Sequence, residues 1–287
     1  MKSIAGRKVL ITGAAAGIGR ATALLLAEEG VQLYLLDINE QALNELAELL
    51  NQRGTVVVAE TCDLADERAL HAGLTDLLDQ WGGVDIVVNN AGIVFYGSTA
   101  EMSDEQWEQV LATNLRSPTQ IIRRLLPSLI ARGEGQIVNV CSLAGLAAFK
   151  YFAAYSMTKA GLLGFTESLR SELAGFGIGV SAICPGFVMT GMHKSALRAN
   201  GGTGMRLPSR LICTSPEAVA KQIVAAVRKN HFLSVVTPFA RLIWMIKRMT
   251  PSLWPVLAAG FRRAKVKAPA RANVPSGLVD SAQSRAA

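Results

Sequence analysis

Two side chains with complementary acid–base chemistry, Tyr155 and Lys159, stand four residues apart in a helical pattern, AAYSMTKAGLL. Positions i and i+4 of a helix share one face, so both side chains can reach the same ligand. A phenol with a pKa near 10 is a poor base, and lowering that pKa by about three units requires roughly 4 kcal/mol of preference for the phenolate. A lysine cation about 4 Å away supplies roughly that much at an effective dielectric constant of about 20. The pair therefore predicts a general acid/base, Tyr155, whose pKa is lowered by Lys159.

A glycine-rich segment near the N-terminus, TGAAAGIGR at 12–20, separates a predicted strand from a predicted helix of Ala and Leu. Glycines in such a turn let the backbone approach a pyrophosphate, and the helix N-terminus offers free N–H groups to it. Because a strand precedes the segment and a helix follows it, the context favours dinucleotide binding over a simple packing turn. The predicted contacts are Gly13, Gly17, Ile18 and Gly19.

Asp37 ends the next predicted strand, within LLDIN. A carboxylate at this point accepts hydrogen bonds from the adenosine ribose hydroxyls and repels a 2′-phosphate. Ala16 and Ile38 stand where a cation would accommodate that phosphate, and neither is basic. The sequence thus predicts NAD rather than NADP. A role for Asp37 as the cap of the following helix is compatible with the ribose contact.

Ser142 follows another predicted strand, GQIVNV at 135–140. Its hydroxyl would hold the substrate oxygen through a hydrogen bond that strengthens as charge develops during hydride transfer. Each candidate also has a structural explanation, since Tyr155 and Lys159 could be an exposed helix pair and Ser142 a turn residue. Their joint occurrence favours catalysis.

The elements that must position these residues are short apolar runs that alternate with helical patterns. The predicted strands are 8–12, 31–36, 55–60, 84–90, 135–140, 178–184 and 233–238. Such alternation predicts parallel pairing through right-handed crossovers, with both faces of the sheet covered. The expected α/β fold is a single Rossmann-type, doubly wound, parallel seven-stranded sheet over residues 1–237, with its ligands at the carboxyl ends of the strands.

The order and spacing of these motifs resemble those of the short-chain dehydrogenase/reductase family over residues 1 to about 237. The matching residues are Thr12 to Gly19, Asp63, Asn89 to Gly92, Asn114, Ser142, Tyr155, Lys159, Pro185, Gly186 and Thr190. Cys141 departs from the pattern, since a second Ser is common there.

The resemblance implies roles for residues that the sequence alone does not assign. It places Asp63 at the adenine, Asn89 and Gly92 along the edge of the fourth strand, and Thr190 at the nicotinamide carboxamide. It has Pro185 and Gly186 shape the turn before Thr190, and it has Asn114 hold a water that relays protons from Lys159. The structural alternatives for Asn114 are a helix N-cap and a polar group inside a helix. It also implies a homodimer or homotetramer assembled through the helices after strands four and five.

The charge of the chain is divided unevenly. The 29 Lys and Arg and 22 Asp and Glu give a net charge of +7, yet residues 241–287 hold nine of the cations and only one acid, Asp280. A basic tail behind a near-neutral domain argues against nucleic-acid binding. Four cysteines without a C-x-x-C pair and three histidines predict no metal site and a cytoplasmic location. No uncharged apolar stretch is long enough to span a membrane.

The loops after the predicted strands contain an apolar set that would form the substrate wall. Its members are Val94, Phe95, Leu143, Leu146, Phe149, Phe152, Met189 and Met192. An apolar wall favours a lipophilic alcohol or ketone over a sugar or a short hydroxy acid. Lys150 and His193 are candidate polar anchors or surface residues, and 191–210 has the composition of a mobile lid.

Three functions fit these patterns. The leading one is an NAD-dependent oxidoreductase that interconverts a lipophilic secondary alcohol and its ketone. The first alternative is an NADPH-dependent carbonyl or 3-oxoacyl-type reductase, which Asp37 disfavours. The second is a non-catalytic dinucleotide-sensing protein, which the presence of Tyr155 and Lys159 disfavours.

Residues 238–267 form a predicted basic, amphipathic helical extension. Phe239, Leu242, Ile243, Ile246 and Met249 fall on one arc of a helical projection, with Arg241, Lys247 and Arg248 opposite. A second short helix is predicted from Thr250 and Pro251 onward. One possibility is that the apolar arc folds back over the mouth of the substrate cavity or onto a partner subunit. The other is that residues 239–267 lie peripherally in an anionic membrane surface, with Trp244 and Trp254 at headgroup depth. Residues 268–287 lack apolar periodicity and are predicted to be disordered.

Overall fold

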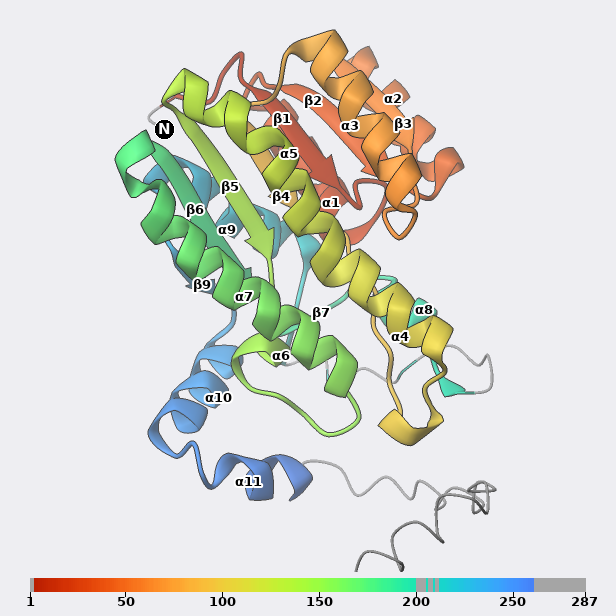
Figure 1. Cartoon of the computed structure of the whole chain (residues 1–287), viewed down its shortest axis with the longest axis vertical. Coiled ribbons are helices and arrows are strands. Elements are labelled where there is room, and N and C mark those ends of the chain that lie inside the picture. Colours follow the sequence, from red (N-terminus) through yellow and green to blue (C-terminus); the bar gives the residue numbers. More distant parts are fainter. Residues whose placement is uncertain (1–2, 200–204, 206–208, 210–211, 261–287) are drawn as a thin grey trace, which may run out of the picture.

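A computed structural model describes residues 3–199, 205, 209 and 212–260 of the 287-residue chain. Its main sheet has seven parallel strands in the order β3-β2-β1-β4-β5-β6-β9 (Figure 1). The strands are β1 (Lys8–Thr12), β2 (Gln32–Asp37), β3 (Val57–Thr61), β4 (Ile86–Asn89), β5 (Gly135–Val140), β6 (Ile178–Cys184) and β9 (Leu233–Val235). The predicted doubly wound, seven-stranded fold is therefore confirmed.

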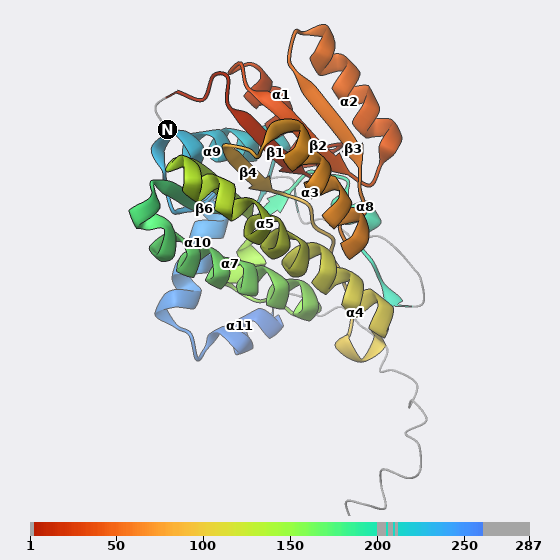
Figure 2. The same cartoon turned by 45° about the horizontal axis from the view of Figure 1, so that its top comes forward.

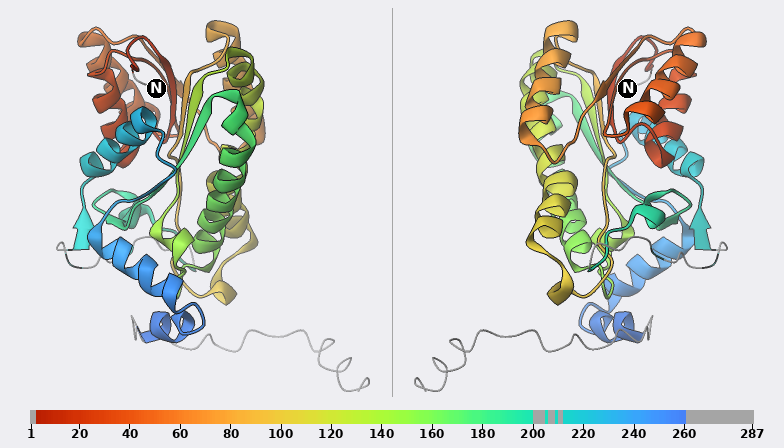
Figure 3. Two further views of the ribbon diagram at one scale, coloured as in Figure 1. Left: turned by 90° about the vertical axis from the view of Figure 1, so that its left-hand side faces the viewer. Right: turned by 90° about the vertical axis from the view of Figure 1, so that its right-hand side faces the viewer.

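Helices cover both faces of this sheet (Figures 2 and 3). One face carries α1 (Gly17–Ala27), α2 (Glu40–Gln52) and α9 (Pro216–Lys229). The other carries α3 (Glu67–Trp81), α5 (Ser117–Arg132) and α7 (Ala153–Leu173). The strand residues alternate between the two apolar clusters; Val9 and Ile11 of β1 face the first, and Leu10 faces the second. This burial on both sides explains the continuous apolar runs in the sequence.

Shorter elements lie near the carboxyl ends of the strands. They are the 3-10 turn η1 (Thr99–Glu101), the helix α4 (Asp104–Leu111), the π-helical segment η2 (Ala112–Arg116), α6 (Leu143–Leu146), α8 (Met192–Ser195), and the strand pair β7 (Phe187–Val188) and β8 (Cys213–Thr214). A second 3-10 turn, η3 (Ala174–Phe176), lies at the opposite edge of the sheet, just before β6 begins. Within the proposed lid at 191–210, α8 is helical, and residues 200–204, 206–208 and 210 lie outside the described part of the chain.

Three of the predicted strands are shorter in the structure. Strand β3 begins at Val57, β4 begins at Ile86, and β9 ends at Val235. Thr237 then caps the next helix by accepting a hydrogen bond from the Ala240 N–H at 3.0 Å.

The chain continues after β9 in two helices, α10 (Pro238–Met249) and α11 (Trp254–Gly260). The first begins at the predicted position. The second begins three residues later than predicted, because Pro251–Leu253 form a turn. The predicted end of the extension near 267 and the predicted disorder of 268–287 lie outside the described residues. None of the described helices is long and apolar enough to cross a bilayer.

Candidate active site

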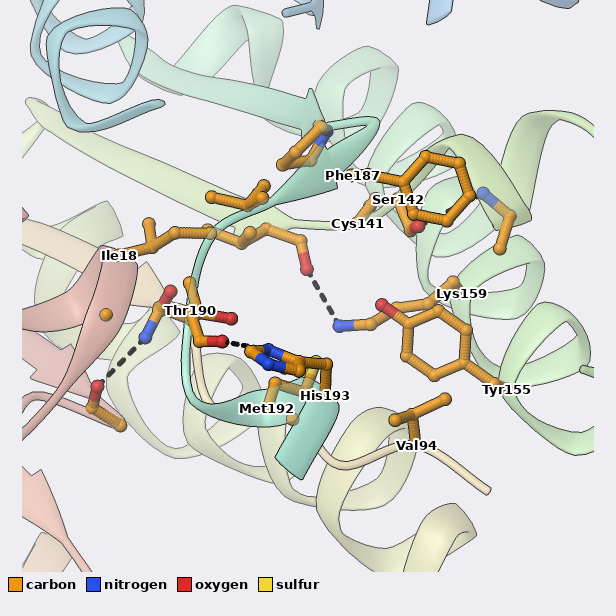
Figure 4. A pocket seen from close by; sticks show the side chains of 18 of the residues that line it. Ile18, Val94, Cys141, Ser142, Tyr155, Lys159, Phe187, Thr190, Met192 and His193 are labelled. Atoms are coloured by element: carbon orange, nitrogen blue, oxygen red, sulfur yellow. Dashed lines mark hydrogen bonds between the residues drawn. The ribbon is translucent and has the colours of Figure 1, made fainter. Parts of the chain in front are cut away.

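A cavity of about 490 Å³ opens at the carboxyl ends of β1, β4, β5 and β6 (Figure 4). Its lining includes Gly13, Gly17, Ile18, Asp37, Gly92, Ser142, Tyr155, Lys159, Pro185, Gly186 and Thr190. The fold thus brings eleven of the predicted site residues, from widely separated parts of the chain, to one cavity. This is the sheet edge at which doubly wound folds bind ligands.

The glycine-rich turn leaves backbone groups open at one side of this cavity. Gly13 and Gly17 have φ values of +65° and +54°, which favour glycine. A Cβ on Gly19 would lie 2.0 Å from the carbonyl oxygen of Gly13, so this position packs the start of α1 against the turn and lies beneath the lining. Ala16 provides no side-chain cap to α1. The N–H groups in the first turn of α1 are therefore free to donate hydrogen bonds to an anionic phosphate.

Asp37 lies at the end of β2 and lines the same cavity. One carboxylate oxygen accepts the N–H of Ala15 at 2.9 Å, and the other accepts the N–H of Asn39 at 2.9 Å. The cap of α2 is Asn39 and not Asp37, so the carboxylate keeps its place beside the glycine turn. The neighbouring Ile38 is 65% exposed and adds no cation.

The three candidate catalytic side chains come from α7 and from the end of β5 (Figure 4). Lys159 is buried, donates a hydrogen bond from Nζ to the Val140 carbonyl oxygen at 2.8 Å, and lies 5.9 Å from the centre of the Tyr155 ring. Ser142 caps α6 by accepting the N–H of Ala144 at 3.0 Å. The hydroxyls of Ser142 and Tyr155 and the ammonium of Lys159 thus converge on one region of the cavity.

Burial determines the acid–base properties of this group. It raises the pKa of Tyr155 to about 12, and the hydrogen bond with Ser142 only partly opposes it. Burial also lowers the pKa of Lys159, while Cys141 and Cys184 act in the opposite direction. In the protein without a dinucleotide the direction is thus opposite to the predicted lowering, because burial of the phenol disfavours its charged form and is the largest cause.

Asn114 lies in the π-helical segment η2 between α4 and α5, and is fully buried. Its side chain accepts the Ile93 N–H at 2.8 Å and donates to the Ile93 carbonyl oxygen at 2.8 Å and to Thr158 at 3.2 Å. A Cβ on Gly92 would lie 3.2 Å from Oδ1 of Asn114 and 3.3 Å from Nζ of Lys159. Asn114 therefore fixes the loop after β4 next to Lys159 without lining the cavity.

Two residues assigned to the cofactor by resemblance lie outside the cavity lining. Asn89 is buried and donates to Asn139 at 2.9 Å within the core, and the following residue, Asn90, lines the cavity instead. Asn90 donates from Nδ2 to the Thr12 and Gly13 carbonyl oxygens, each at 3.0 Å. Since β4 ends at Asn89, the next residue is the first to leave the sheet at its ligand-binding edge. Asp63 is exposed and accepts the Ala65 N–H at 2.9 Å.

The predicted apolar wall is confirmed in part. Val94, Leu143, Phe149, Phe152 and Met192 line the cavity. The other three predicted residues do not: Phe95 is buried in a separate cluster with Val110 and Ala154, Leu146 is partly buried against a core cluster, and Met189 is 45% exposed. Lining residues that were not predicted as wall include Phe187, Val188 and Met205.

Of the two candidate polar anchors, one lies at the cavity. His193 lines it and approaches the Thr190 carbonyl oxygen at 2.5 Å through Nδ1, as Figure 4 shows. Lys150 is exposed and stacks over Tyr151, with 4.9 Å between Nζ and the ring centre.

Comparison with known proteins gives consistent matches. The family model for short chain dehydrogenases matches residues 7–201. The ketoacyl reductase HetN of Nostoc is 33% identical over 237 residues, which cover 82% of this chain and 80% of HetN.

Solved structures agree with the sequence matches. A short chain dehydrogenase/reductase from Burkholderia phymatum in complex with NAD superposes with a TM-score of 0.78 at 27% identity, covering 88% of this chain and 96% of that one. A short-chain dehydrogenase from Sphingobium yanoikuyae in complex with NADPH gives a TM-score of 0.75 at 25% identity, covering 90% and 98%. These two relatives therefore bind different nicotinamide cofactors on the same fold.

Proposed function

This chain belongs to the short-chain dehydrogenase family, an oxidoreductase family that acts on CH–OH and keto groups, and we propose that it uses NAD to interconvert a lipophilic secondary alcohol and its ketone. The observation that carries the proposal is the convergence of Ser142, Tyr155 and Lys159 on a cavity that also contains Asp37 and an apolar wall. The glycine turn and Asp37 fit the phosphates and the ribose of a dinucleotide.

The choice of NAD rests on charge. Asp37 supplies a carboxylate at the predicted ribose position, and among the described lining residues Lys159 is the sole Lys or Arg. A 2′-phosphate would therefore meet a negative charge without a neighbouring cation. Thr190 lines the cavity next to the glycine turn, since a Cβ on Gly17 would be 3.0 Å from its Cγ2, and its contact with the nicotinamide carboxamide is proposed from the family resemblance.

The glycine turn, Asp37 and Lys159 would hold the dinucleotide, which when bound would supply the hydride acceptor for alcohol oxidation and the hydride donor for ketone reduction. During oxidation, the phenolic oxygen of Tyr155 takes the hydroxyl proton as the C=O bond forms, and during reduction it gives the proton back. Ser142 donates a hydrogen bond to the substrate oxygen. Lys159 holds the ribose and provides positive charge beside Tyr155, and Asn114 positions the loop around Gly92.

The apolar wall leads to the first prediction. For a series of 2-alkanols, kcat/KM with NAD should rise roughly fourfold per added methylene until the wall is covered, because each buried methylene contributes about 0.8 kcal/mol. The control substrates are 2-hydroxy acids with the same chain lengths as the 2-alkanols. They would place a carboxylate against the same apolar wall, so their kcat/KM should be low. Absorbance of NADH measures the rates. Activity confined to short polar substrates would contradict the lipophilic assignment.

We also propose a homo-oligomer assembled through the helices that follow β4 and β5. The outer side of α5 supports it, because Arg123, Leu126, Pro127, Ile130 and Ala131 line a shallow groove there. Two of these, Leu126 and Ile130, are only half-buried in the single chain. Pairing of such faces would remove them from water.

A further inference from the structure

The C-terminal helices α10 and α11 are anchored directly behind the cavity wall. Trp254 is 3% exposed, donates from Nε1 to the Ala148 carbonyl oxygen at 2.9 Å, and meets the Phe149 ring edge-on at 5.8 Å between centres. Phe149 in turn lines the cavity. The prediction that Trp254 lies at headgroup depth is therefore wrong. Both helices lie beyond the carboxyl ends of the strands, and α10 contacts α6 (Figures 1 and 3).

The side of α10 that packs on the domain differs from the predicted apolar arc. Ala240 and Ile243 are buried, whereas Leu242 and Met249, which were assigned to the same arc, are 56% and 78% exposed. The helix is apolar on both sides, so its periodicity did not reveal which side meets the core. One side is used for packing, and the other remains in solvent.

The exposed parts of α10, of the turn that follows it and of α11 carry an unusual concentration of large apolar side chains. Six of the eleven exposed large hydrophobic residues in the described chain fall within 242–257. We call this set the exposed apolar face; it consists of Leu242, Met245, Met249, Leu253, Val256 and Leu257. Grouped apolar exposure of this kind marks an interaction surface, whereas scattered single residues do not.

The charge around this face is of one sign. Arg241 and Arg248 are exposed on α10, and residues 238–260 contain no Asp or Glu. On the helical projection both arginines lie on the same side of Met245, about 40° and 60° from it at 100° per residue, and Leu242 and Met249 lie on its other side. Two copies apposed through this face would bring four arginines together without a carboxylate from either segment. An anionic surface provides the missing negative charge.

We propose that the exposed apolar face docks on an anionic lipid bilayer, with its apolar side chains among the acyl chains and Arg241 and Arg248 at the headgroups. The combination of apolar and cationic side chains on a short helix pair is typical of binding in the plane of the interface. Because Trp254 links α11 to Phe149, docking would hold the cavity wall close to the lipid. This places the site beside a reservoir of lipophilic substrate, although binding itself requires no turnover.

The test uses the full-length protein and sedimentation with vesicles of phosphatidylcholine alone or with about 30% phosphatidylserine. Truncation before α10 is unsuitable, because it would remove Ile243 and Trp254 from the core. The variant Leu242→Gln, Met245→Gln, Met249→Gln should lower partitioning onto anionic vesicles by more than about tenfold. The matched control is Val56→Gln, Phe176→Gln, which changes exposed apolar residues just before β3 and β6 and should bind as the wild type does.

A second variant tests the charge. Arg248→Gln should lower binding to anionic vesicles roughly fivefold and leave binding to neutral vesicles unchanged. Arg53→Gln, at the exposed end of α2, is its control. All variants should keep wild-type activity on a water-soluble alcohol and wild-type oligomeric mass.

Three results would overturn the proposal. In the first, the wild type does not bind anionic vesicles. In the second, the wild type and the triple glutamine variant bind them equally. In the third, the wild type binds no vesicles and the triple glutamine variant has a lower oligomeric mass than the wild type. The last result would identify the face as a contact between copies of the chain. None of these outcomes depends on the cofactor or on the reaction, so they are independent of the proposed function.

Discussion

Replacing Tyr155 with phenylalanine should lower kcat for alcohol oxidation by about 10³-fold, within the range that general acid–base catalysis contributes. The change removes the phenolic oxygen that lies with Ser142 and Lys159 in the cavity, while the ring keeps its contacts. The dissociation constant for NADH, measured by fluorescence titration, should change little. The expected loss is therefore in the chemical step.

The control is Tyr96→Phe, since Tyr96 is half-buried and does not line the cavity. A Tyr155→Phe enzyme with more than about a tenth of wild-type kcat would contradict the assignment of the acid/base. If the wild type binds NADH but oxidises no alcohol, the protein is instead a dinucleotide sensor.

The pH dependence supplies a second readout of the same residue. Burial raises the pKa of Tyr155 to about 12, so the neutral phenol dominates at neutral pH and is ready to donate a proton to a ketone. Oxidation needs the phenolate, so its rate should rise with pH through the alkaline range. Ketone reduction should stay constant and then fall as the phenol ionises.

The second large effect concerns the cofactor. The double variant Asp37→Ser, Ile38→Arg should lower the ratio of kcat/KM for NAD to that for NADP by roughly 100-fold or more, since one charged hydrogen bond alone contributes about 1.5–3 kcal/mol. The change removes the carboxylate that repels a 2′-phosphate and adds a cation at a position that is already exposed. Rates with the two cofactors on one alcohol give the ratio.

The single variants serve as controls for this double variant. Asp37 also accepts hydrogen bonds from the N–H groups of Ala15 and Asn39, so the serine change will weaken the turn and lower kcat/KM for both cofactors. The ratio of the two kcat/KM values cancels this shared effect and reports the recognition of the 2′-phosphate charge. A wild-type preference for NADP, or a ratio that the double variant leaves unchanged, would contradict the role of Asp37.

The sheet and most of the site could be predicted because each depends on local pattern. Buried parallel strands need continuous apolar runs, and the glycine turn and Tyr155–Lys159 pair have fixed spacings. The sequence pattern could not predict that Asn90, and not Asn89, lines the cavity. Neighbouring residues of a strand point to opposite faces, so a difference of one residue in where β4 ends decides which side chain faces the core.

The C-terminal extension shows a second limit. Its helical period was predicted correctly, but Leu242 is exposed whereas its neighbour Ile243 is buried. Only the packing of the helix on the domain decides which of these two apolar side chains is buried. Trp254 likewise has the residue type expected at a membrane interface. In the structure it is buried instead, because its N–H donates to the Ala148 carbonyl oxygen and its ring packs against the Phe149 ring. The acidity of Tyr155 also depends on burial, which residue spacing does not report.

The most direct test of the central claim follows one deuterium atom. The wild-type enzyme is mixed with NAD and the best 2-alkanol, deuterated at its carbinol carbon, and the products are examined by mass spectrometry. We predict one deuterated NADH for each ketone formed, with a rate below that of the undeuterated alcohol. Binding of NAD without any deuterium transfer to it, from every alcohol in the series, would contradict the account.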